Sequence, residues 1–298
     1  MTHGTTIVVV TVAAGRHDHL AAQIRGLASS SLAPAEHIVV AMGDKKIAAV
    51  VGEKTGTGAN TDGSDTHGTD GLTRVVHTDV TGPSLPLAHA RNLGARTAFS
   101  RGADLVVFLD VDCIPGTDML ARYADAASRP QHRRTLLCGP VTYLPPNPSG
   151  WTPTELRAHT DPHPARPNPS DGVVETGSNY DLFWSLSFAV TPDTWDDIGG
   201  FFPGYSGYGG EDTDFAATAH AAGIGLRWVG GAHAYHQHHP VSSPPLEHLD
   251  DIVRNSAVFH RRWNRWPMEG WLSEFENRGL ITRTSSGDIR RTGEQPYP

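Results

Sequence analysis

The feature that most constrains the fold is the apolar run Val106–Leu109, which ends in Asp110-Val111-Asp112. A short run rich in β-forming residues, bounded by Gly102 and by Pro115-Gly116, predicts a buried strand of a parallel sheet. Ligands of open parallel sheets bind at the carboxyl ends of strands, so Asp110 and Asp112 are expected at that edge. Two carboxylates without adjoining thiolates suit Mg²⁺ or Mn²⁺ that carries phosphate oxygens. An Asp-x-Asp tripeptide alone also fits a helix cap, so the interpretation depends on the rest of the chain.

Composition limits the classes of protein to which the chain can belong. With 298 residues it can bury one large α/β domain. A formal net charge of −8 argues against a nucleic-acid or anionic-membrane surface. No signal-peptide pattern and no stretch of about 18 apolar residues is visible, and two cysteines cannot form a disulfide scaffold. We therefore expect a cytoplasmic protein without a transmembrane segment, for which a peripheral position at the inner membrane face stays open.

The N-terminal part has the pattern of a nucleotide-binding half-sheet. A β-branched run over Ile7–Val12 predicts a first strand, helical spacing over His17–Leu27 predicts a helix, and Ile38–Met42 predicts a second buried strand. The strand ends carry Arg16 and Asp44, as expected of a strand-helix-strand unit that binds a nucleotide. The three-glycine dinucleotide fingerprint and the phosphate-loop Gly-Lys-Ser/Thr are both absent, which disfavours a nicotinamide enzyme and a phosphate-loop NTPase.

Helices and strands are expected to alternate along the rest of the chain. A helix over Leu85–Ser100 carries Gly94, which suggests close packing on the sheet, and Arg91, which either reaches a diphosphate or forms a surface salt bridge. The polar segment 52–71 is interpreted as a surface insertion, and Pro145–Asp171 as an irregular loop over the site. The other expected elements are a strand at Thr73–Thr78, a helix at Gly116–Ser128, a strand at Leu136–Tyr143, a helix from Pro192, a helical cover over Leu246–Phe275 and a frayed tail after Arg283.

A second acidic cluster, Glu211-Asp212-Thr213-Asp214, follows Gly207-Tyr208-Gly209-Gly210 and opens an alanine-rich helix. Acidic residues in a first helical turn are favoured by the helix dipole and need no function. The preceding glycines are not explained in that way, because glycine lets a backbone approach a ligand closely. A carboxylate at this position that faces the metal edge could accept a proton from an attacking hydroxyl.

Four histidines fall within the seven residues 233–239. Alternation along a strand would place His236 and His238 on one face and His233, Tyr235, Gln237 and His239 on the other. One imidazole that completes the coordination of a divalent ion is plausible. A zinc site made from this cluster alone would lack cysteines and a helical His-x-x-x-His pair.

Taken in order, these motifs resemble those of the GT-A glycosyltransferases, specifically family 2 enzymes with a galactosyltransferase-like C-terminal half. The resemblance covers about residues 5–245 and rests on Ala90–Gly94, Asp110–Asp112, Gly209–Asp214 and a downstream histidine. It implies an α/β fold with an open, mixed, mostly parallel sheet, helices on both faces and a helical C-terminal cover. The catalytic domain would span residues 1–245, divided near residue 115 into nucleotide-binding and acceptor-binding halves. A helical extension at 246–283 and a tail at 284–298 would follow.

The resemblance implies a metal-dependent, inverting glycosyltransferase of the hexosyltransferase class. It would move a sugar from a nucleoside-diphosphate sugar, a UDP-sugar first of all, to a hydroxyl of a glycan, lipid-linked or small-molecule acceptor, with Mn²⁺ or Mg²⁺. Asp212 would be the catalytic base beside Glu211, and the metal ligands would be Asp112, Asp110 and one of His236 and His239. The nucleotide sugar would contact Thr11, Ala13, Arg16, Asp44, Arg91, Asp110 and Val111, and the acceptor would contact Trp184, Tyr208, Gly209, Gly210 and Asp214.

Two departures from the family pattern and two other classes of function bear on this interpretation. The second strand ends in Met42-Gly43-Asp44-Lys45 instead of Asp-Asp-Gly-Ser, and Tyr208 stands where galactosyltransferases carry tryptophan. A sugar nucleotidyltransferase would use the same sheet and Mg²⁺, but needs a glycine-rich basic loop after the first strand, where only Gly15-Arg16 follows. A non-catalytic sugar- or metal-binding domain would not need Glu211-Asp212.

Overall fold

The computed structural model describes residues 5–52, 66–67, 71–284 and 286–292. Most of the insertion predicted at 52–71 lies outside these residues. Within them, no helix is long and apolar enough to cross a membrane.

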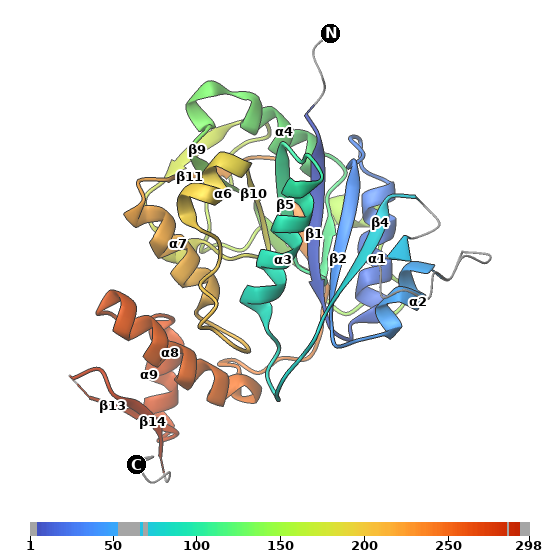
Figure 1. Ribbon diagram of the computed structural model, residues 1–298. Coiled ribbons are helices and arrows are strands. Elements are labelled where there is room, and N and C mark those ends of the chain that lie inside the picture. The colour runs from blue at the N-terminus through green and yellow to red at the C-terminus, as the bar shows by residue number, and fades with distance from the viewer. Residues whose placement is uncertain (1–4, 53–65, 68–70, 285, 293–298) are drawn as a thin grey trace.

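A nine-stranded sheet forms the centre of the molecule, with the order β3-β4-β2-β1-β5-β10-β7-β11-β9 (Figure 1). From β4 to β5 the neighbouring strands are parallel, whereas β10 runs antiparallel to both β5 and β7. The sheet is therefore parallel from β4 to β5 and mixed beyond β5, while the two-residue edge strand β3 is antiparallel to β4. Its strands are β1 Ile7–Ala13, β2 Glu36–Met42, β3 Thr66–His67, β4 Thr73–Thr78, β5 Leu105–Leu109, β7 Thr135–Cys138, β9 Val174–Gly177, β10 Ser187–Val190 and β11 Gly225–Val229.

Helices cover both faces of this sheet, as expected. Alternate residues of β1 enter two cores: Val8 and Val10 pack toward α3 Leu87–Ser100, α6 Pro192–Ile198 and α7 Glu211–Ala221. Ile7 and Val9 pack on the opposite face, toward α1 His17–Ala28 and α4 Met119–Ser128. Further along that face, α2 Lys46–Gly52 packs on β2 and β4. The expected architecture is thus confirmed.

Gly94 has the packing role that its position suggested. A Cβ at this residue of α3 would collide with the Val10 side chain and lie 3.2 Å from Cγ2 of Val40. The helix can therefore approach β1 and β2 closely only because residue 94 has no side chain.

A second, three-stranded sheet, in the order β6-β12-β8, carries the histidine cluster. Its strands are β6 Cys113–Pro115, β8 Val141–Tyr143 and β12 Ala234–His236. The prediction of one strand over Leu136–Tyr143 was wrong, because β7 belongs to the large sheet and β8 to the small one. The chain changes sheets at Gly139-Pro140, where a Cβ on Gly139 would collide with the carbonyl oxygen of Ala232 and proline has no N–H for a ladder.

The segment Pro145–Asp171 is not irregular throughout. Helix α5, Pro153–Ala158, begins at a capping box in which Thr152 and Glu155 bond each other's backbone N–H. The signal was present in the sequence as Thr-x-x-Glu with proline at the first helical position. Three single 3₁₀ turns complete the shorter elements, at Pro130–His132, Tyr180–Leu182 and Leu246–His248.

The C-terminal residues form a unit with a small core of its own, seen in orange and red in Figure 1. The predicted cover over Leu246–Phe275 is two helices, because positive φ angles at Asn264 and Met268 interrupt it. The tail expected after Arg283 includes a strand that pairs with the residues before it, which explains why it does not fray there. The unit consists of α8 Leu249–Trp263, α9 Glu269–Asn277, β13 Ile281–Arg283 and β14 Ile289–Arg291.

Candidate active site

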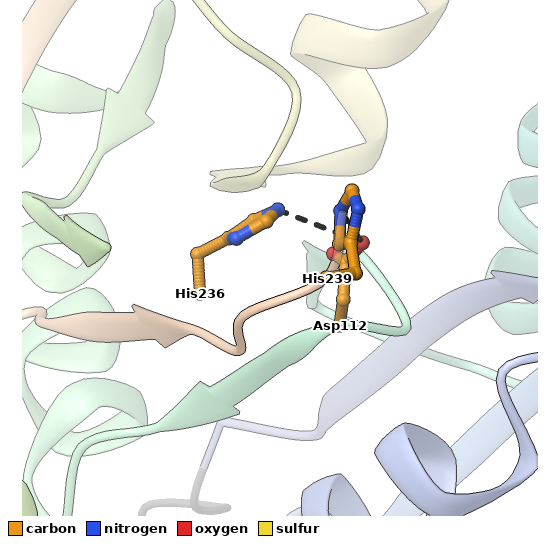
Figure 2. Close-up of side chains that lie close together, drawn as sticks. All are labelled: Asp112, His236 and His239. Atoms are coloured by element: carbon orange, nitrogen blue, oxygen red, sulfur yellow. Dashed lines mark ion pairs between the residues drawn. The ribbon is translucent and has the colours of Figure 1, made fainter. Parts of the chain in front are cut away.

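One carboxylate and two imidazoles converge where the two sheets meet. Ligand atoms of Asp112, His236 and His239 all lie within 4.8 Å of one another, and Figure 2 shows both rings turned toward the carboxylate. The Nε2 atoms of His236 and His239 are 3.5 and 3.4 Å from Oδ2 of Asp112. A carboxylate oxygen and two imidazole nitrogens suit a divalent transition ion such as Mn²⁺.

Local backbone structure explains why both histidines reach the same carboxylate. Strand β12 pairs with β6, which sets His236 opposite Cys113, and the N–H of Gln237 donates to the carbonyl oxygen of Asp112 at 2.7 Å. The strand ends at His236, so the chain can turn and bring His239 to the same side. The predicted alternation was wrong for this reason: it assumed a strand through residue 239 and separated the two histidines.

An arginine and two histidines surround Asp112. Burial acts to raise the pKa of Asp112, but a hydrogen bond from His239 and the charges of His236 and Arg16 outweigh it and lower the pKa. Nη1 of Arg16, at the start of α1, lies 3.8 Å from Oδ2 of Asp112. Asp112 is therefore an ionised carboxylate at neutral pH, as a metal ligand must be.

Arg91 joins the two acidic motifs. Its Nη2 donates to Oδ1 of Asp110 at 3.1 Å and its Nη1 to Oε1 of Glu211 at 3.0 Å. The side chain is only 4 % exposed, so this is a buried ion-pair triad and not the surface salt bridge considered from the sequence. The arginine comes from α3, Asp110 from the end of β5 and Glu211 from the start of α7. The triad thus connects the acidic start of α7 to Asp110, two residues before the candidate metal ligand Asp112.

Electrostatics at Glu211 and Asp212 are opposite to those at Asp112. Burial and the charge of Asp212 raise the pKa of Glu211 to about 7, against the charge of Arg91. Burial also raises the pKa of Asp212, although Arg91 and hydrogen bonds from Thr213 counteract it. Nearby Asp110 has a pKa raised to about 6, chiefly by burial. Glu211, whose pKa is near neutral, readily takes up a proton at that pH.

Four of the residues predicted to contact the nucleotide, Thr11, Ala13, Arg16 and Asp44, lie in or after β1 and β2, whereas Arg91 lies in α3 and Asp110 and Val111 follow β5. Oδ2 of Asp44 accepts hydrogen bonds from the N–H of Gly15 and from Nε2 of His17, each at 2.8 Å. The hydroxyl of Thr11 is buried and donates within the protein, to Gln23 or to the carbonyl of Leu109. Ala13, at the end of β1, is also buried, whereas Val111 is partly exposed between the two aspartates. Their contacts to a nucleotide stay predictions.

The predicted acceptor residues lie in different surroundings. Tyr208 is 38 % exposed and stacks on His248 with a centroid distance of 4.5 Å, while Trp184 is partly buried. Gly209 and Gly210 are buried. Asp214 is completely buried, and its Oδ1 accepts hydrogen bonds from Tyr205, Arg262 and Trp263. The contacts of Asp214 connect α7 to α8, and an acceptor contact at this residue stays a prediction.

The sequence interpretation missed several residues around the candidate metal ligands. The ring of Tyr143 is 4.7 Å from that of His236, and the ring of His19 is 6.3 Å from that of His239. His163 in turn lies edge-on to both Tyr143 and Trp184. No local pattern identifies these residues, because they come from separate elements that only the folded chain brings together.

Comparisons with known proteins agree with this geometry. Residues 174–240 match a family model described as the N-terminal domain of galactosyltransferase. Among solved structures, the chain is similar to GalNAc-T7 with UDP, GalNAc and Mn²⁺, with a TM-score of 0.55, 14 % identity and coverage of 93 % of this chain and 57 % of that one. It is also similar to S. aureus TarS 1-349, with a TM-score of 0.54, 13 % identity and coverage of 93 % and 72 %. A second S. aureus TarS structure is similar with a TM-score of 0.55 and 14 % identity, and the match covers 93 % of this chain and 44 % of that one. No curated protein sequence matches the chain.

Together, these findings show a GT-A fold in which residues 174–240 are similar to a galactosyltransferase domain. The chain spans 57 % of the GalNAc-T7 chain that it matches. The particular reaction is therefore a matter for the proposal that follows.

Proposed function

We propose that the protein is a metal-dependent inverting glycosyltransferase that moves a sugar from a nucleoside-diphosphate sugar to an acceptor hydroxyl. The observation that supports this proposal is that Asp112 clusters with His236 and His239, while Arg91 donates hydrogen bonds to both Asp110 and Glu211. A site for a divalent ion and a candidate general base would thereby share one sheet edge. UDP-sugars are the first donors to test, because the similar GalNAc-T7 structure holds UDP and Mn²⁺.

Asp112, His236 and His239 would hold Mn²⁺ or Mg²⁺, and we favour Mn²⁺ because two imidazoles are poor ligands for Mg²⁺. The bound ion would neutralise negative charge that develops on the departing nucleoside diphosphate. Arg16 adds positive charge close to Asp112, where it could contact the diphosphate. Asp44 would contact the base at the ends of β1 and β2.

Asp212 would accept the proton of the acceptor hydroxyl as that oxygen attacks the anomeric carbon from the face opposite the leaving group. A bond forms from the acceptor oxygen to the anomeric carbon while the bond from that carbon to the diphosphate oxygen breaks. One displacement of this kind inverts the anomeric centre and needs a single base. Glu211 is buried, whereas Asp212 is partly exposed, and Glu211 accepts a hydrogen bond from Arg91, so we assign it the positioning of the arginine and of Asp110.

The exposed ring of Tyr208 lies immediately before this acidic turn and is backed by His248 and Trp271. An aromatic face of this kind stacks on the apolar face of a sugar ring, so we propose that Tyr208 and Trp184 contact a glycan or another glycosylated acceptor.

The first test is a thermal-shift panel of UDP, GDP, dTDP and ADP, each with Mn²⁺, with Mg²⁺ and with EDTA. A ligand that binds only the folded state raises the melting temperature by mass action, so UDP with Mn²⁺ should give a shift that EDTA abolishes. Asp112→Asn should remove the metal-dependent part, whereas Asp118→Asn, on an exposed residue of the same segment, should retain it. A metal-dependent shift with GDP alone would indicate that the donor is a GDP-sugar and not a UDP-sugar. No shift with any nucleotide would contradict the proposal.

A further inference from the structure

The glycine loop, residues 206–210, is held by the C-terminal helix α8. The side-chain amide of Asn255 donates to three carbonyl oxygens of the loop, those of Ser206 at 3.0 Å, Tyr208 at 3.3 Å and Gly209 at 2.8 Å. Asn255 is completely buried, so these carbonyls cannot exchange the amide for water without opening the structure. The two N–H bonds of one α8 side chain are thus shared among three backbone oxygens of this loop.

A second residue of α8 holds the loop from its N–H side. Oδ2 of Asp251 accepts a hydrogen bond from the N–H of Tyr208 at 3.1 Å, and its Oδ1 accepts one from the hydroxyl of Ser84 at 2.8 Å. Arg254 donates to both Asp251 and the carbonyl of Ser206. The loop is therefore connected through α8 to the segment that precedes α3.

The glycines themselves are explained by this helix. Gly207, Gly209 and Gly210 have φ angles of +71°, +93° and +89°, which side-chain-bearing residues rarely adopt. A Cβ at Gly207 would also collide with the Asp251 carboxylate, and one at Gly209 would lie 3.3 Å from Cγ1 of Ile252. The glycines had been interpreted as a means of approaching a ligand, but they also allow α8 to approach the loop.

The same helix holds the other side of the catalytic turn. Nε of Arg262 and Nε1 of Trp263 donate to Oδ1 of Asp214 at 2.7 and 2.6 Å. Glu211 and Asp212 therefore lie between two attachment points, one at Gly209 through Asn255 and one at Asp214 through Arg262 and Trp263. Among the elements described, α8 supplies both.

We propose that α8 is part of the catalytic apparatus and that Asn255 is a positioning residue that sets the orientation of Asp212 relative to the metal ligands. This inference rests on the proposed glycosyltransferase function for its effect on rate, but its structural content does not. Reacting groups must be held within a fraction of an ångström of the productive geometry, so loosening the glycine loop should slow the chemical step more than it weakens donor binding.

The test compares Asn255→Leu, which keeps a similar volume without donors, with Asn277→Leu, a control at the exposed end of α9. Asn255→Ser is made in parallel, because it removes the amide without adding apolar bulk and keeps the test decisive should the leucine variant not fold. Two quantities are measured: hydrogen exchange of the amides in residues 206–213 and of β1 and β5, and the kcat and KM for nucleotide-sugar hydrolysis with Mn²⁺.

In the Asn255 variants we expect faster exchange confined to residues 206–213, and kcat lowered by about tenfold or more with KM changed less than about twofold. The control should match the unmodified protein in both measurements. Unchanged exchange in 206–213, or exchange raised equally in β1 and β5, would overturn the inference. So would an unchanged kcat in a protein that turns over nucleotide sugars. If the unmodified protein hydrolyses no nucleotide sugar, the proposed function fails, and the exchange measurement still decides whether Asn255 holds the loop.

Discussion

Asp112 and the pair Glu211-Asp212 are similar carboxylates in opposite environments. Asp112 follows a strand and is surrounded by Arg16, His236 and His239, which lower its pKa. Glu211 and Asp212 begin a helix, where burial raises the pKa of both groups and the charge of Asp212 raises that of Glu211 further. Pairs of titratable groups whose environments move their pKa values apart commonly divide the roles of an active site. One motif is suited to holding a cation and the other to receiving a proton.

Arg91 stands between these environments. It donates to Asp110 on one side and to Glu211 on the other, and it is the buried cation nearest to the second motif. Without Arg91, the carboxylates of Asp110 and Glu211 would lose the cation that both of them contact. Substitutions in either acidic motif or at Arg91 should therefore test the difference between the motifs.

The largest effect is expected for Asp212→Asn, which removes the proton acceptor and keeps the shape. General base catalysis contributes roughly 10²- to 10⁴-fold, so kcat for sugar transfer should fall by that factor. The thermal shift with UDP and Mn²⁺ should persist, because the metal ligands are unchanged. Transfer at a rate close to that of the unmodified enzyme would show that the base is a different residue.

Arg91→Met is expected to have the next largest effect, and on stability instead of chemistry. Removing one partner of a buried ion pair destabilises a protein by about 3–5 kcal/mol, because it leaves the other charge uncompensated. Denaturant unfolding should report this loss at pH 8 and a smaller one at pH 5, where the carboxyl groups with raised pKa values are protonated. Arg96→Met, an exposed residue one turn further along α3, is the control. Equal losses for both variants would refute a structural role for the triad.

His236→Ala and His239→Ala should each weaken Mn²⁺ binding. Even partners beyond the coordinating atoms change metal affinity by about 10- to 100-fold, so loss of a ligand should change it at least as much. His238→Ala, the exposed neighbour, is the matched control. Isothermal titration with Mn²⁺ measures all three, and an unchanged affinity in one variant would remove that histidine from the ligand set.

The positions of the acidic residues could be predicted from the sequence, but not all of their partners. The positions of Asp110, Asp112, Glu211 and Asp212 followed from hydrophobic periodicity and from helix start signals, because a buried strand and an amphipathic helix leave local patterns. Which histidines meet Asp112 could not be predicted in the same way. That depended on where β12 ends, which the pairing with β6 and β8 decides.

The sequence predicts that Arg91 lies on a helix, but it does not predict its two hydrogen-bond partners. Its two partners lie 19 residues downstream and 120 residues downstream in the chain, and only the sheet order brings them together. Likewise, the glycine pattern at 207–210 was visible, but the approach of α8 was not, because contacts between a loop and a distant helix leave no periodic signal. Long-range packing therefore accounts for most of what the sequence interpretation missed.

The smallest effect, and the sharpest test of the contrast, concerns Glu211→Gln. The folded-state pKa of about 7 lies above the ordinary value near 4.5, so the folded protein binds more protons than the unfolded chain between these values. Stability contributed by this group is present at low pH and is lost as pH rises toward 7. Glutamine does not titrate and can still accept from Arg91, so the melting temperature of the variant should fall less between pH 5 and pH 8 than that of the unmodified protein. Glu175→Gln, on exposed residue 175 of β9, is the control, and all samples contain EDTA so that metal binding does not contribute. Parallel curves for Glu211→Gln and the unmodified protein would mean that Arg91 fully compensates Glu211, and the proposed difference between the two acidic motifs would then rest on Asp212 alone.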